Sequence, residues 1–166
     1  MQKIEGKKIK YRFNLPNSGY DKKLVVDLKN KNDVVDVRGI IVGRGNEKFN
    51  INIEIVHRAK NTSARTVVKA VLYDSAQLNF KGCIKVLKGM RGCDSFLMQR
   101  TLVLGENVQV NSKPHLEIEE NNVKCSHSVS IARPNEEEVF YLMSRGLSKD
   151  FAINLIADGF IGVRPL

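Results

Sequence analysis

The sequence predicts a mainly β protein in which a stack of short strands is followed by two short helices. Apolar and polar residues alternate over residues 34–131, similar patterns recur along this region, and the periodicity becomes helical after residue 134. A chain of 166 residues is long enough for one domain with a real core. We therefore expect a β core over residues 1–133 and a C-terminal helical segment over residues 134–166.

The predicted strands are rich in Val, Ile and Leu and are separated by Gly, Asn, Asp and Pro. They comprise residues 34–43, 49–57, 66–73, 76–86, 100–105 and 123–131. Long helices are excluded over this region because the apolar period is two and β-branched residues dominate.

A faint repeat suggests how these strands are arranged. The segments "DSAQLNFKG" (74–82) and "LGENVQVNS" (104–112) share one order of polar and apolar residues, and "ENNVKCS" (120–126) repeats the same phase after about half that interval. Such recurrence favours coils stacked in a β-solenoid. A β-sandwich would give a similar pattern and is the alternative.

The C-terminal region carries two sets of helix signals. Asn135 before three glutamates predicts an N-cap, with Glu138 at the capping-box position, and Gly146 predicts the end of the helix. Ser148 predicts the cap of a second helix. The expected apolar stripe of the first helix is Val139, Phe140, Leu142 and Met143, and the expected buried side of the second is Ala152, Ile153, Leu155, Ile156 and Phe160.

The net charge of +9 is unevenly distributed, with a basic body up to residue 115 and an acidic tail. A basic surface favours nucleic acid in some proteins. Here the lysines are scattered among strand positions without aromatic-rich or zinc-finger motifs, which favours a solvated surface and no nucleic-acid partner. No apolar run of eighteen residues and no signal-peptide pattern occurs, so we expect a cytoplasmic protein without a membrane span.

Cysteine and histidine offer the only candidates for metal or sulfur chemistry. Alternation along 123–131 places Cys125 and His127 on one face of a strand, which gives half of a tetrahedral metal site or, alternatively, two core residues. Cys83 falls on the outward phase and is expected to be exposed unless Gly82 marks a bulge, and Cys93 resembles a turn residue. Neither of these two cysteines is expected to be a ligand, and without a CxxC pair all three are expected to be thiols.

Enzyme signatures such as GxSxG, the P-loop and HExxH are absent, so we expect a non-enzymatic protein.

The run from residue 57 to 160 resembles the C-terminal part of the SufB/SufD family of iron–sulfur cluster assembly proteins. The most specific segments are "SKPHLEI" (112–118), "VKCSH" (123–127) and "FYLMSRGL" (140–147). The resemblance implies a right-handed parallel β-helix with a short C-terminal helical hairpin. Full-length members also carry a helical N-terminal domain, for which these residues show no counterpart.

The resemblance further implies a SufD-like scaffold that pairs with itself or with a SufB-like chain. His127, with Cys125, would be the cluster-assembly candidate, and no cofactor would be held stably beyond a transient iron–sulfur cluster at the subunit interface. The helical segment, with Phe140, Tyr141, Arg145 and Gly146, would dock a SufC-like ABC ATPase.

Three positions depart from the family pattern. The sulfur-accepting cysteine of SufB falls at Gln99, and the glutamates that flank the matching histidine of SufB are replaced by Ser126 and Ser128. SufD proteins usually have glycine where this chain has Ser128. These departures favour an alternative function, a protein-interaction module of the same fold that has lost cluster chemistry.

Overall fold

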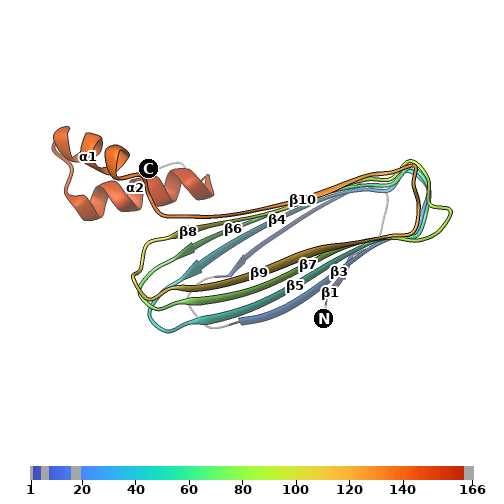
Figure 1. Cartoon of the computed structure of the whole chain (residues 1–166), viewed down its shortest axis with the longest axis horizontal. Coiled ribbons are helices and arrows are strands. Elements are labelled where there is room, and N and C mark those ends of the chain that lie inside the picture. The colour runs from blue at the N-terminus through green and yellow to red at the C-terminus, as the bar shows by residue number, and fades with distance from the viewer. Residues whose placement is uncertain (1, 5–7, 16–19, 163–166) are drawn as a thin grey trace.

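The computed structural model describes residues 2–4, 8–15 and 20–162, and it is a parallel β-helix followed by a helical hairpin (Figure 1). Parts of the segments predicted over 1–133 and 134–166 lie outside these residues. The first coils contain β1 (Gln2–Ile4), β2 (Lys8–Leu15), β3 (Tyr20–Leu28), β4 (Val34–Gly43) and β5 (Lys48–His57). The later coils contain β6 (Ser63–Leu72), β7 (Gln77–Val86), β8 (Asp94–Val103), β9 (Gln109–Ile118) and β10 (Lys124–Ala132).

Successive strands alternate between two five-stranded sheets. One sheet has the order β1-β3-β5-β7-β9 and the other β10-β8-β6-β4-β2, and every pairing between neighbours is parallel. Lys48 pairs with Gln77 and Gln77 with Gln109, so each of these steps is one full coil. The predicted β-solenoid is therefore confirmed and the sandwich alternative is wrong. The shorter interval, between the repeated segments 104–112 and 120–126, corresponds to half a coil. The first segment leads into β9 in one sheet and the second into β10 in the other.

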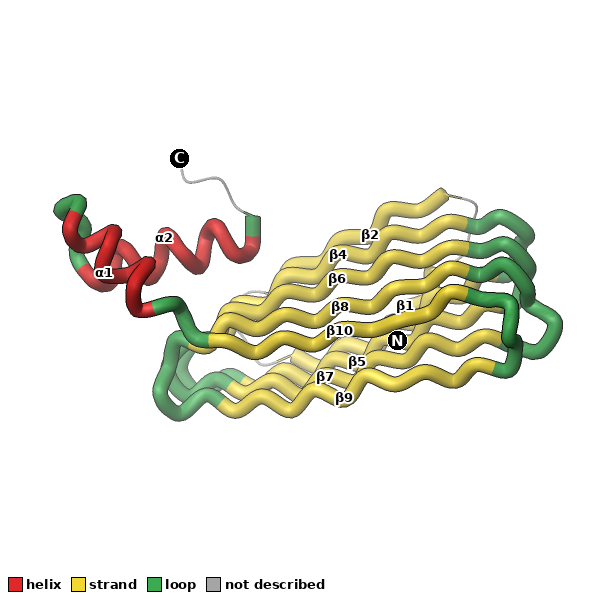
Figure 2. Tube along the Cα trace, turned by 45° about the horizontal axis from the view of Figure 1, so that its top comes forward, coloured by secondary structure: helices red, strands yellow, loops and turns green. Residues whose placement is uncertain are grey.

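The interior between the sheets is filled by the alternate side chains that point inward. Leu24, Phe49, Ile51, Ile53, Leu78 and Phe80 are at most 2% exposed. Each coil covers the inward-facing side chains of the coil before it. The coil of β9 and β10 is the last coil of the described chain (Figure 2). Its inward-facing side chains are only partly buried.

A polar contact network lies at the turn between β5 and β6. The Nδ1 atom of His57 lies 2.7 Å from the hydroxyl of Thr62, which donates to the carbonyl of Ala59 and lies 3.2 Å from the sulfur of Cys93. All three of His57, Thr62 and Cys93 are at most 1% exposed. Cys93 lies at the predicted turn, directly after Gly92, which has a left-handed backbone conformation. Its side chain is buried in the core.

The expectation that Cys83 is exposed is wrong. Its side chain points outward, as the phase predicts, and the register of β7 runs past Gly82 without a bulge. The residue is nevertheless only 8% exposed, because charged side chains on β5 and β9 cover it. Burial raises the pKa of this thiol to about 11, and the carboxylates of Glu117 and Glu54 add to the shift.

The two helices are α1 (Glu136–Ser144) and α2 (Lys149–Ile161). As predicted, Asn135 and Ser148 cap them, accepting from the backbone N–H of Glu137 and Phe151 at 2.9 and 3.3 Å. Gly146 takes the left-handed conformation, with φ of 93°, directly after α1. The hairpin extends past the ends of the strands (Figure 1).

Only α2 packs closely on the β-helix. Ala157, with Ile156, Phe160 and Ile161, contacts Val71 and Leu102. Lys69 donates to the carbonyl of Phe160 at 2.6 Å, and Tyr73 donates to Asn154 at 3.2 Å. Of the predicted buried side of α2 only Ala152 is fully buried and the others are partly exposed. The predicted stripe of α1 has no fully buried member: α2 packs against this helix and leaves Val139 and Leu142 half-buried, whereas Phe140 and Met143 are exposed. No helix in the described residues is long and apolar enough to cross a membrane.

Candidate functional site

The last strand, β10, places the predicted cluster-assembly residues on one face. Cys125 pairs in register with Ser95, and His127 with Leu97, both inward-facing residues of β8. The prediction that Cys125 and His127 share a face is therefore confirmed. They lie at the end of the β-helix where no further coil follows in the described chain (Figure 2).

The two residues differ in burial. Cys125 is half-buried and packs against the main core, and this burial, with the nearby Cys93, raises the pKa of its thiol. His127 is exposed. Cys125 is therefore a protonated core thiol at neutral pH, whereas the imidazole of His127 is accessible to a ligand or to another chain.

Apolar side chains surround His127 on the same end of the β-helix. Val129 and Ile131 on β10 are 37% and 49% exposed, and Leu116 and Ile118 on β9 are 37% and 39% exposed. We call these four residues and His127 the open end. They point inward in phase but have no coil above them, and the outer edges of β9 and β10 have no strand partner within the described residues. Exposed apolar residues beside unpaired strand edges are typical of a surface that another chain covers.

Gln99 lies directly beneath this surface. It is fully buried, pairs in register with Val129, and donates through its side-chain amide to Thr101. Its carbonyl oxygen has no partner in the described structure. The position that the resemblance assigns to a sulfur-accepting cysteine therefore holds a buried amide under the open end.

Within the described residues, Cys125 and His127 do not join a third candidate metal ligand. The one cluster of three such side chains there is Cys83, His115 and Glu117, whose donor atoms all lie within 4.8 Å of one another. Sequence reasoning missed it because Cys83 and His115 belong to different coils and lie far apart along the chain. The repeat was the available signal, since residues one coil apart come into register.

The hairpin presents its predicted docking residues to solvent. Phe140 and Tyr141 are 73% and 56% exposed, and Arg145 and Gly146 are exposed as well. The guanidinium of Arg145 lies 5.2 Å from the ring centre of Tyr141. Between α1, α2 and the end of β8 lies a groove that includes Val103, Val139, Phe140 and Met143. Aromatic and arginine side chains beside an apolar groove are typical of protein-binding surfaces.

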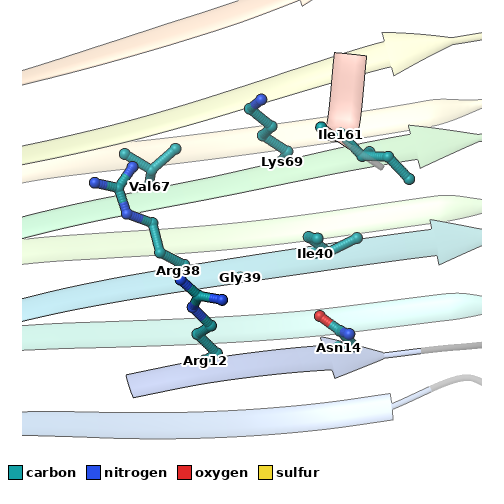
Figure 3. A pocket seen from close by; sticks show the side chains of 9 residues that line it. Arg12, Asn14, Arg38, Gly39, Ile40, Val67, Lys69 and Ile161 are labelled. Carbon is teal, nitrogen blue, oxygen red and sulfur yellow. The ribbon is translucent and has the colours of Figure 1, made fainter. Parts of the chain in front are cut away.

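A basic pocket of about 270 Å³ lies where the end of α2 meets the outer face of β2, β4 and β6 (Figure 3). Arg12, Arg38 and Lys69 line it. Arg38 is held by Asp36 through two hydrogen bonds of 2.6 and 2.9 Å, which lowers the pKa of that carboxyl. Burial, and then the charges of Arg100 and Arg38, lower the pKa of Lys69. Part of the basic surface is thus neutralised within the chain.

Comparison with known families decides the assignment. A family model described as the SufBD core domain of the SUF system for FeS cluster assembly matches residues 7–160. The chain belongs to the SufBD family. The parallel β-helix with two C-terminal helices is thus the structure of a SufBD core, and the resemblance of residues 57–160 is confirmed.

Three curated relatives place this SufBD chain more closely. It is 32% identical over 126 residues to the iron–sulfur cluster assembly protein SufD of Bacillus subtilis and 28% identical over 133 residues to that of Escherichia coli. These matches cover 76% and 80% of this chain but only 29% and 31% of the relatives. A SufBD family protein of Synechocystis is 38% identical over 94 residues, which are 57% of this chain and 21% of that protein. The matched segments therefore span less than a third of the length of each of these relatives.

Proposed function

We propose that this SufBD chain is a non-catalytic, SufD-like scaffold for iron–sulfur cluster assembly. In this proposal it pairs through the open end with a second copy or with a SufB-like chain, and it docks a SufC-like ABC ATPase on the helical hairpin. The observation that carries the proposal is the position of His127, exposed at the end of the β-helix among apolar residues that suit a subunit interface. An iron–sulfur cluster would be the cargo of this interface and not a resident cofactor.

Pairing would bring His127 out of water and beside the partner chain. The imidazole is a common ligand for iron, and the neighbouring Val129 and Ile131 would exclude water from the interface. Ser126 and Ser128 carry hydroxyl groups in place of carboxylates, and both face the other side of β10. His127 is then the one polar side chain among the five residues of the open end.

Substitution of His127 by alanine is expected to lower cluster yield on a SufB-like partner about tenfold or more, because loss of a group that binds or supports a metal ligand typically costs that much. The yield is measured by anaerobic reconstitution with ferrous iron and sulfide, followed by the visible absorption of the cluster. The matched control is Ser130→Ala, on the outward face of the same strand. An unchanged yield with His127→Ala contradicts the assembly role.

The second candidate function is an interaction module that has lost cluster chemistry. The buried amide of Gln99 and the presence of Ser128 favour it. This alternative predicts pairing and ATPase docking with no dependence of cluster yield on His127. The same reconstitution therefore separates the two candidates.

Truncation of Phe140 to alanine is expected to weaken binding of a SufC-like ATPase about tenfold or more, because a few large side chains, often aromatic, carry most of the energy of an interface. Pull-down and calorimetric titration measure the affinity. Phe151→Ala is the control, since Phe151 is also exposed, at 58%, but lies on α2. Equal losses in the two variants, or none in either, would rule out the predicted docking residues on α1.

A further inference from the structure

The outer face of the last two coils carries a second group of chemically reactive side chains, separate from the open end. Cys83 on β7 and His115 on β9 are direct register partners, so their Cα atoms lie about 4.8 Å apart. Glu117 follows two positions after His115 on the same face of β9. A thiol, an imidazole and a carboxylate thus point to one side of the sheet.

The donor atoms of this group are already close to coordination distance. All three lie within 4.8 Å of one another, and the Nε2 atom of His115 is 3.5 Å from the Oε1 atom of Glu117. Ligands on a tetrahedral ion with bonds of about 2.0–2.3 Å lie about 3.3–3.8 Å apart. Small rotations of His115 and Glu117, whose side chains are 55% and 48% exposed, would bring their donor atoms and the buried sulfur of Cys83 onto one ion.

Lys85 orients the carboxylate without blocking it. Its Nζ atom donates to the Oε2 atom of Glu117 at 2.9 Å and lowers the pKa of that carboxyl, so Glu117 is ionised. The Oε1 atom remains directed toward His115. In known metal sites the carboxylates that bind the ion are themselves held by hydrogen bonds, as Lys85 holds Glu117 here.

The surroundings also favour a cation. Glu54 on β5 is the register partner of Cys83, and with Glu117 it places two carboxylates around the sulfur. After burial, these charges contribute to the raised pKa of the Cys83 thiol. The negative potential that disfavours a bare thiolate attracts a divalent ion, which would take the place of the thiol proton and release that proton to water.

We propose that Cys83, His115 and Glu117 form a binding site for a divalent transition metal of the zinc or ferrous class. One sulfur, one nitrogen and one oxygen ligand suit such ions and do not suit magnesium or calcium. The side chains of His115 and Glu117 are 55% and 48% exposed. The fourth position therefore faces solvent, and the ion can exchange. The inference does not rest on the proposed scaffold function, because the site lies within one chain.

Cobalt(II) tests the proposal on the isolated, reduced chain, without any partner. We expect saturable binding of one ion per chain, with a thiolate-to-cobalt charge-transfer band in the near ultraviolet. Cys83→Ser should abolish that band, and His115→Gln and Glu117→Gln should each weaken binding about tenfold or more. Zinc(II) should displace the cobalt.

Cys125→Ser is the matched control, because Cys125 also lies near a histidine and should leave the band unchanged. The absence of saturable binding overturns the proposal. So does a band that persists in Cys83→Ser or vanishes in Cys125→Ser. His115→Gln should leave the fold intact, because the side chain of His115 is exposed. Unchanged affinity of this variant for cobalt therefore also overturns the proposed site.

Discussion

Aspartate at both Val129 and Ile131 is expected to weaken pairing through the open end at least about 100-fold, equivalent to about 2.7 kcal/mol. In a paired state these side chains would be enclosed between two β-helices. A carboxylate there would lose its hydration without a compensating partner, and the apolar contact would be lost as well. Sedimentation over a range of protein concentrations measures the dissociation constant for self-association, and titration with a SufB-like chain measures it for the mixed pair.

The matched control for this prediction lies on the same strand. Ser126 and Ser130 face away from the open end, so Ser126→Asp together with Ser130→Asp adds the same charge on the opposite face of β10. Because Val129 and Ile131 are already exposed in the single chain, the double variant should lose no more than about 0.5 kcal/mol of stability per site. Equal weakening by the serine control, or undiminished pairing in the Val129 and Ile131 variant, contradicts the proposed interface. A wild-type chain that binds neither itself nor a SufB-like chain contradicts it too.

The fold could be predicted from the sequence where the signals are local or strictly periodic. The strands follow an apolar period of two, and Asn135 and Ser148 cap their helices through hydrogen bonds to near neighbours in the chain. The same alternation of inward and outward side chains correctly predicts that Cys125 and His127 share a face and that Cys83 points outward. These features depend on neighbours along the chain, which the sequence displays directly.

The features that could not be predicted depend on neighbours from other coils. Cys83 is covered by side chains of β5, one coil before it, and of β9, one coil after it, and no local pattern encodes that cover. Ile118 and Leu116 lie in the core phase and yet are exposed, because β9 belongs to the last coil. Phe140 and Met143 of the α1 stripe are exposed for a similar reason, since helical periodicity predicts an apolar face but not the surface that covers it.

The candidate site shows the same division. His127 could be named from its motif, and its accessibility follows only from the end of the stack. The segment "SKPHLEI" on β9 shows how neighbouring residues of one edge strand can have different roles, because alternate side chains face opposite ways. In "SKPHLEI", Leu116 belongs to the open end, whereas His115 and Glu117 lie on the outer face. One short segment can therefore contribute both to pairing and to the proposed metal site.

Stability is expected to fall by about 3 kcal/mol between pH 6.5 and pH 4, and His57 is the reason. Its imidazole is fully buried, its Nε2 atom has no partner in the described structure, and burial lowers its pKa from 6.5 to about 4, against a small opposing effect of Asp94. The unfolded chain therefore binds a proton in this range that the folded chain does not bind. The contribution of His57 to the free energy of unfolding is fully present well above pH 6.5, declines as the pH falls through 6.5 toward 4, and levels off at lower pH.

Urea denaturation at a fixed protein concentration, at pH 7 and at steps down to pH 4, measures this decline. His57→Gln cannot take up the proton and should remove most of it, whereas His127→Ala, which changes an exposed histidine, should retain it. The carboxyl groups of Asp36 and Asp94 have pKa values lowered by Arg38 and Arg65, so their contributions are lost mainly below pH 4, at the acid end of this range. An equal decline in His57→Gln would show that another group is responsible. Proton resonances of the His57 ring give a second test, because they should not titrate above about pH 5, whereas a midpoint near 6.5 would mean that the imidazole is protonated within the fold.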